Sequence, residues 1–138
     1  MISEISYGIV PVREGKILLL RVFDNWDFPK GKPEGTESPI ETAIRELREE
    51  SALINPQFLW GTEFAETAPY KKGKKVARYF IASCPTGDVQ LLPNPEDGTV
   101  EHHGFLWLTI DDAAVKLPDR HAPVMAWIKS VLDDGKPN

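Results

Sequence analysis

Residues 38 to 53 carry the pattern of one amphipathic helix with a defined start, and this helix constrains the rest of the fold. Ser38 suits an N-cap, a proline follows at the first helical position, and Glu41 stands where a capping box places its glutamate. Beyond this start, apolar residues recur with helical spacing at Ile40, Ala43, Ile44 and Leu47. Such a stripe must face a core, so the sequence predicts a helix packed against other elements.

A second face of this helix gathers three glutamates. At about 100° per residue, Glu46, Glu49 and Glu50 share a face turned by roughly 120° from the apolar stripe. Like charges three and four residues apart repel each other, and acids late in a helix oppose its dipole. A solvated, charged helix face would account for the glutamates alone. Hard divalent cations such as Mg²⁺ or Mn²⁺ prefer carboxylate oxygens, so the cluster also predicts a metal site.

A short loop with glycines and lysines leads into the helix. It contains Gly31, Lys32 and Gly35, with Lys30 directly before it. Lysines beside a carboxylate cluster suggest that phosphate is bound next to a metal ion. A solvated helix face would leave this loop unexplained, together with its fixed spacing to the helix.

The loop and the helix together resemble the signature of the Nudix hydrolases. That signature is a glycine, five residues, a glutamate, seven residues, and then Arg-Glu-aliphatic-x-Glu-Glu-x-Gly-aliphatic. Over residues 31 to 53, the positions that match are Gly31, Glu37, Arg45, Glu46, Leu47, Glu49, Glu50 and Leu53. Ala52 departs from the pattern, because the family has a glycine that can leave the helix in a left-handed conformation. Alanine pays roughly 1 kcal/mol there, so a longer or differently closed helix end is expected.

The resemblance implies a fold and a metal-dependent activity. The implied fold is a three-layer α/β/α sandwich around a mixed β-sheet, and the implied reaction is pyrophosphate hydrolysis. Glu46, Glu49 and Glu50 would bind Mg²⁺ or Mn²⁺, and the carbonyl of Gly31 would be an additional ligand.

Two further catalytic roles follow from the same resemblance. Arg45 would work with Glu37 to hold the loop against the helix. Glu101, which precedes two histidines at the entry to an expected strand, is a candidate for the general base or for an additional metal ligand. The alternative for Glu101 is a solvated loop acid.

Composition limits the class of protein. A chain of 138 residues suits a single domain spanning residues 1 to 138. The formal net charge of -5 argues against a stable nucleic-acid partner, which would call for a broad basic face. Cys84 is the single cysteine, which excludes an intrachain disulfide and fits a cytoplasmic setting. No stretch approaches the ~20 apolar residues of a membrane span, so we expect no membrane partner. We also expect a monomer or weak homodimer.

Hydrophobic patterns outside the signature predict the remaining elements. Strands are expected at 5–12, 16–22, 58–64, 75–82 and 103–108. Thr109 suits the start of a short helix, and a last helix carries the apolar residues Val124, Trp127, Ile128 and Val131. The proline-rich segment 85–99 is expected to be a surface loop, and residues 135–138 are expected to fray.

Substrate choice must depend on residues outside the signature. The segments 26–32 and 69–80 resemble corresponding stretches of the diadenosine tetraphosphate hydrolases, a Nudix subgroup, although Lys32 replaces a histidine. Such a substrate carries several negative charges between two flat bases, which call for cations and an aromatic surface. The resemblance makes the candidate contacts Lys30, Lys32, Tyr70, Lys75 and Tyr79. The alternative is that the lysines of the turn are solvated and that Tyr79 belongs to the sheet core.

The leading hypothesis is a nucleotide-type substrate, diadenosine tetraphosphate, split asymmetrically into ATP and AMP. Within the same fold, the alternatives are removal of pyrophosphate from RNA 5′ ends, hydrolysis of diphosphoinositol polyphosphates, and hydrolysis of nucleoside triphosphates. A hypothesis of another class is a Nudix-fold module that binds a nucleotide without cleaving it. Such modules usually lose signature carboxylates, and this chain keeps them all.

Overall fold

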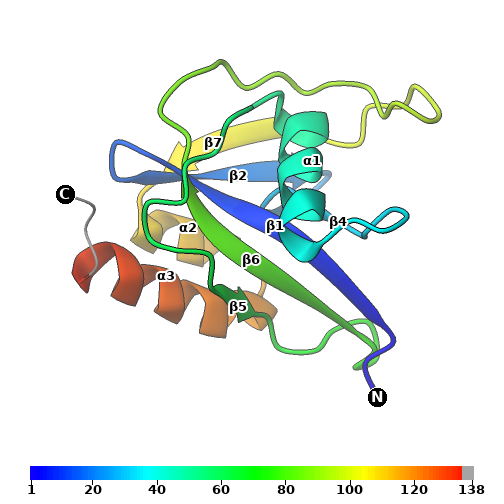
Figure 1. The fold of residues 1–138 in the computed structure, drawn as a ribbon. Helices are drawn as coiled ribbons and strands as arrows, with labels where there is room; N and C mark the ends of the chain where they lie inside the picture. The colour runs from blue at the N-terminus through cyan, green and yellow to red at the C-terminus, as the bar shows by residue number, and fades with distance from the viewer. Residues whose placement is uncertain (135–138) are drawn as a thin grey trace.

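The computed structural model describes residues 1–134, in which a seven-stranded mixed β-sheet lies between helices (Figure 1). The strands are β1 (Glu4–Arg13), β2 (Lys16–Val22), β3 (Asn25–Asp27), β4 (Lys30–Gly31), β5 (Phe64–Glu66), β6 (Lys75–Ser83) and β7 (Gly104–Leu108). The helices are α1 (Pro39–Ser51), α2 (Ile110–Lys116), the 3₁₀ helix η1 (Asp119–His121) and α3 (Ala122–Asp134). The expected frayed tail at 135–138 lies outside the described residues.

Strand β1 is the centre of the sheet. It runs parallel to β6 from the pair Glu4 and Lys75 to the pair Val12 and Ser83. All other pairings are antiparallel: β1 with β2 and β4, β2 with β3 and β7, and β5 with β6. The sheet is therefore mixed, as the sequence predicted.

Alternating side chains of the central strands build two cores, one on each face of the sheet. Ile9 and Leu18 belong to the core that includes Leu47 of α1, whereas Val10 belongs to the core that includes Ile128 of α3. Because successive strand residues point to opposite faces, one run of apolar residues supplies both cores. Helix α1 covers one face and α2 and α3 cover the other (Figure 1), which confirms the three-layer sandwich.

Helix α1 begins as predicted, but its C-terminal end does not have the predicted form. The Ser38 hydroxyl accepts a hydrogen bond from the backbone N–H of Glu41, whose carboxylate accepts one from the backbone N–H of Ser38, so the capping box is present. At the other end Ala52 has φ 67° and donates its N–H to the carbonyl of Arg48. The expectation of a longer or differently closed helix end is therefore wrong, because this alanine adopts the left-handed conformation that glycine would have taken.

Most expected elements are present with small shifts at their ends, and one expectation is wrong. The segment expected as a strand at 58–64 is mostly loop, and only β5 begins at its end. Phe58 and Trp60 pack from this loop against the two different cores. The short strands β3 and β4 were missed. No helix within residues 1–134 has the length and apolar character needed to cross a membrane.

Candidate active site

A close contact between β4 and α1 brings the signature loop to the helix. Gly31 of β4 pairs with Tyr7 of β1, which fixes the loop to the centre of the sheet. A Cβ atom on Gly31 would overlap the carboxylate of Glu46. Glycine is needed here because it lets the Glu46 carboxylate lie directly against the strand backbone.

Arg45 ties the loop to the helix through a fork of hydrogen bonds. Its Nε and Nη2 donate to the two oxygens of Glu37 at 2.7 and 3.0 Å, and Nη2 also donates to the carbonyl of Lys32 at 3.0 Å. Its Nη1 donates to Glu46 at 2.6 Å and to Glu49 at 2.9 Å. Hydrogen bonds from Arg45 lower the pKa of Glu37 to about 2. This geometry agrees with the holding role that the resemblance implied for Arg45 and Glu37.

Glu46 and Glu50 form a close carboxyl pair. Their side chains are only 15% and 12% exposed, and both line the same cavity. The backbone N–H of Lys30 donates to Glu50 at 3.3 Å. Burial, and then the neighbouring Glu46 carboxyl, raise the pKa of Glu50 well above its ordinary value. Two carboxyl groups this close cannot both hold their charge without a compensating cation.

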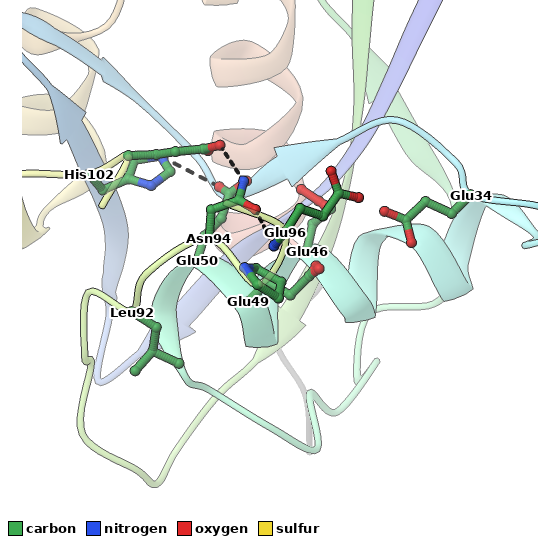
Figure 2. Close-up of a pocket in the computed structure, with 10 residues that line it drawn as sticks. Glu34, Glu46, Glu49, Glu50, Leu92, Asn94, Glu96 and His102 are labelled. Carbon is green, nitrogen blue, oxygen red and sulfur yellow. Dashed lines mark hydrogen bonds and ion pairs between the residues drawn. The ribbon is translucent and has the colours of Figure 1, made fainter. Parts of the chain in front are cut away.

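The glutamates of α1 face a cavity of about 150 Å³ together with residues of the long loop between β6 and β7 (Figure 2). Glu46, Glu49 and Glu50 line this cavity, and the loop contributes Glu101 and His102. The structure thus brings the four predicted acids of the site to one cavity. The remaining lining residues are Glu34, Leu92, Asn94, Pro95 and Glu96.

The three helix glutamates do not enclose an ion position as they stand. Across residues 1–134, no three His, Cys, Asp or Glu side chains are grouped closely enough to hold a metal. Arg45 Nη1 contacts the carboxylates of both Glu46 and Glu49 and acts as their counterion. The donor set nevertheless fits a hard divalent cation, because several carboxylate oxygens line one cavity.

Glu101 reaches the site on an anchored loop. Its carboxylate accepts a hydrogen bond from Asn94 Nδ2 at 2.8 Å. The start of the loop is fixed by Arg13, whose side chain donates to the carbonyls of Cys84, Thr86 and Gly87. Glu101 is exposed, as the alternative of a solvated loop acid expects, and it also lines the cavity that the carboxylates of α1 face.

The predicted substrate contacts separate into two groups. Lys30 and Tyr70 line a larger cavity of about 530 Å³, which meets the acidic cavity at Glu50, Glu101 and His102. Lys32 and Lys75 instead form ion pairs with Glu4 at 2.8 and 2.6 Å, outside both cavities.

Tyr79 is a correction to the predicted set. Its side chain is 0% exposed within the core on the α3 side of the sheet. Its ring has no open face on which a base could stack, and its hydroxyl donates to Asp27 at 2.6 Å. The alternative that assigned Tyr79 to the sheet core is the one that the structure supports.

Sequence reasoning missed a polar network behind the larger cavity. Asp27 Oδ1 accepts from the backbone N–H of Phe28 at 2.7 Å and lies 2.8 Å from His121 Nε2, and Asp27 Oδ2 lies 3.3 Å from Arg120 Nη2. Burial opposes ionisation of Asp27, but His121, Lys30 and Tyr79 together outweigh it and lower the pKa to about 2. No local motif could have revealed the network, because its partners are 93 and 94 residues apart in the sequence.

Comparison with known proteins agrees with this geometry. The NUDIX domain family matches residues 3–128. The asymmetrical bis(5′-nucleosyl)-tetraphosphatase of Rattus norvegicus is 30% identical over 103 residues, which cover 71% of this chain and 67% of that protein. The mRNA-decapping protein g5R of African swine fever virus is 37% identical over 59 residues, or 41% of this chain and 24% of that protein.

A solved structure shares the fold. The crystal structure of a C. elegans Ap4A hydrolase binary complex superposes with a TM-score of 0.72 at 24% identity, covering 96% of this chain and 99% of that one. The family match spans the signature loop, α1 and the loop that carries Glu101. The chain therefore belongs to the Nudix hydrolase family.

Proposed function

We propose that this protein is a metal-dependent pyrophosphohydrolase that splits diadenosine tetraphosphate and related dinucleoside polyphosphates asymmetrically, giving ATP and AMP from the former. The observation that carries the proposal is the junction of two cavities at Glu50, Glu101 and His102. One cavity is lined by carboxylates, and the other contains Lys30 and the ring of Tyr70. A phosphate chain with bases attached needs both kinds of surface.

The acidic cavity supports a specific division of roles. Glu46, Glu49 and Glu50, which line this cavity, would hold Mg²⁺ or Mn²⁺, and the carbonyl of Gly31 would be the additional donor. When bound, such ions offset phosphate charge and acidify a bound water. Arg45 donates hydrogen bonds to Glu46 and Glu49, and it would share these carboxylates with a bound metal ion.

The chemical step is hydrolysis of a phosphoanhydride. A water oxygen forms a bond to one phosphorus atom of the chain. The bond from that phosphorus to the bridging oxygen breaks, and the other nucleotide leaves with the bridging oxygen. Glu101 is the candidate that accepts the proton of the attacking water, because its carboxylate faces the glutamates of α1 from the loop. Lys30 would bind the phosphate chain, and Tyr70 would contact a base.

The similarity to a decapping protein favours a second candidate, which is cleavage of a diphosphate bond at an RNA 5′ end. The chain spans only 24% of that relative's length. Its formal charge of -5 also offers little attraction for a polynucleotide.

One experiment separates these functions. Purified protein is incubated with Mg²⁺ or Mn²⁺ and, in parallel, diadenosine tetraphosphate, capped and triphosphorylated RNA, diphosphoinositol polyphosphate and nucleoside triphosphates, and products are identified by chromatography. We expect ATP and AMP in equal amounts from the first substrate. Preferential turnover of another compound, or two ADP from the first, would contradict the proposal. Tight nucleotide binding without turnover would indicate a binding module instead.

A further inference from the structure

The larger cavity has an acidic boundary and a basic wall. Glu50 and Glu101 line its junction with the acidic cavity, whereas Lys30, Lys71 and Arg120 also line it. Of the three cations, the sequence singled out Lys30 and not Arg120. Its position far along the chain, in η1, brings it to this wall only through the fold.

Arg120 is held in a defined orientation. Its guanidinium lies 4.3 Å from the centre of the Tyr70 ring, and its Nη2 donates to Asp27 at 3.3 Å. Its carbonyl accepts from the backbone N–H of Ala68 at 2.9 Å, which joins η1 to the segment that carries Tyr70. A guanidinium fixed in this way loses less rotamer freedom when it binds an anion.

The donors of Arg120 are not exhausted by these contacts. Within residues 1–134 its guanidinium makes one hydrogen bond, to Asp27, although it carries five N–H donors. The side chain remains 27% exposed on the cavity wall. It can therefore donate to a ligand without leaving Asp27.

Asp27 orients two cations without neutralising both. Arg120 Nη2 and Lys30 Nζ lie 3.3 and 4.0 Å from the same Asp27 oxygen. Tyr79 and His121 hold the other oxygen from the core side. One carboxylate facing two cations leaves positive charge directed at the cavity, which suits a phosphate group.

The other two lysines expected to bind phosphate also share one carboxylate, but their ion pairs are short and lie outside both cavities. Lys32 and Lys75 both pair with Glu4, at 2.8 and 2.6 Å. The side chain of Lys32 is 64% exposed, so its charge is also screened by water.

From this arrangement we infer that Arg120 is a phosphate-chain contact beside Lys30, with Asp27 as its positioning residue, and that Lys32 and Lys75 are not contacts. The inference rests on the proposed function and names a residue that determines how its substrate is held. It places the phosphate chain in the larger cavity, against the wall where Asp27 faces Lys30 and Arg120.

The test uses inorganic tripolyphosphate, which has the charge of the chain and no base. Its dissociation constant is measured by calorimetry with Mg²⁺ for the wild type and for Arg120→Gln, Lys30→Gln, Lys32→Gln and Lys75→Gln. Glutamine at position 120 keeps a planar group over Tyr70 and a donor for Asp27, so the fold should persist, and melting temperature checks this. Arg48→Gln, on the exposed side of α1, is the matched control.

We expect Arg120→Gln and Lys30→Gln each to weaken tripolyphosphate binding roughly tenfold, the loss of one charge-assisted contact. Arg120→Lys should recover part of that loss, and the Lys32, Lys75 and Arg48 variants should bind as the wild type does. The inference is overturned if the wild type does not bind tripolyphosphate or if Arg120→Gln binds it normally. Equal losses in the Lys32 or Lys75 variants would overturn it as well.

The outcome also separates this inference from the proposed substrate. If tripolyphosphate binding depends on Arg120 but the protein does not cleave diadenosine tetraphosphate, the phosphate contact at Arg120 and Lys30 is supported and the proposed substrate is contradicted. If Arg120→Gln cleaves diadenosine tetraphosphate with unchanged kcat and KM, the role of Arg120 as a phosphate contact is contradicted, but the proposed substrate is not. Weaker binding of adenosine but not of tripolyphosphate would assign Arg120 to the base and overturn the inference.

Discussion

Ala52 is a non-glycine residue in the left-handed region at the end of α1, with φ 67°. A Cβ atom is disfavoured there by about 1 kcal/mol. Ala52→Gly should therefore raise the free energy of unfolding by up to about 1 kcal/mol, measured by chemical denaturation.

A matched control is available in α3. Ala126 is exposed in the interior of that helix. The same substitution there, Ala126→Gly, should lower the free energy of unfolding by about 1 kcal/mol. If both glycines destabilise the protein alike, the left-handed conformation of Ala52 contributes no strain.

Glu49 is the helix glutamate whose removal is best tolerated by the fold. Its carboxylate contacts Arg45 and faces the acidic cavity, and its side chain is 21% exposed. Glu49→Gln keeps a hydrogen-bond acceptor for Arg45 but removes a charged oxygen ligand. Turnover should fall by orders of magnitude while the melting temperature changes little.

Glu63→Gln provides the comparison, because Glu63 is exposed in the loop before β5. It should leave both turnover and melting temperature unchanged. Normal turnover in Glu49→Gln would mean that the catalytic site is not at this cavity.

At the level of elements, Asp27 at the end of β3 joins the sheet to η1. Its pKa is lowered to about 2 from the model-compound value of 3.8, so the folded state favours the charged form. The resulting stabilisation is present above pH 3.8 and is lost as pH falls toward 2. A difference of this size corresponds to about 2 kcal/mol.

Asp27→Asn should accordingly lower the free energy of unfolding at neutral pH by about 2 kcal/mol. It should also flatten the decline in stability between about pH 4 and pH 2. Chemical denaturation across a pH series measures both effects, and Asp24→Asn, at an exposed position nearby, is the control. An unchanged acid profile in Asp27→Asn would show that this carboxylate is not the group responsible.

Local patterns in the sequence predicted the elements whose causes are local. The capping box of Ser38 and Glu41 fixed the start of α1, and short runs of apolar residues identified β1, β2 and β6. The aromatic segment around Trp60 was misassigned because the same residues can pack from a loop as well as from a strand.

The same limit applies to the site. The glutamates of α1 lie within one helical segment and could be recognised from their spacing. The ion pairs of Lys32 and Lys75 with Glu4 depend on the sheet register, and the contact between Asp27 and Arg120 joins opposite ends of the chain. No pattern within a short segment contains that information.

For the whole molecule, the close carboxyl pair of Glu46 and Glu50 predicts that metal binding stabilises the fold. A ligand at one hundred times its dissociation constant adds about 2.7 kcal/mol to the free energy of unfolding. Mg²⁺ or Mn²⁺ should therefore raise the melting temperature, and EDTA should reverse the effect.

The comparison is a potassium salt at equal ionic strength, which should give a smaller shift. Glu50→Gln should weaken the response to the divalent ion, because the pair then keeps a single ionisable carboxyl. A melting temperature that responds equally to both salts would argue against a specific ion site on α1.

The parallel ladder between β1 and β6 also has a consequence for synthesis of the protein. The central strand, whose residues Ile9 and Val10 are completely buried, finds its parallel partner only at residues 75–83. A nascent chain shorter than this leaves one edge of this buried strand unpaired. Synthesis must therefore reach residues 75–83 before the parallel ladder can form, and until then the unpaired strand edge favours aggregation.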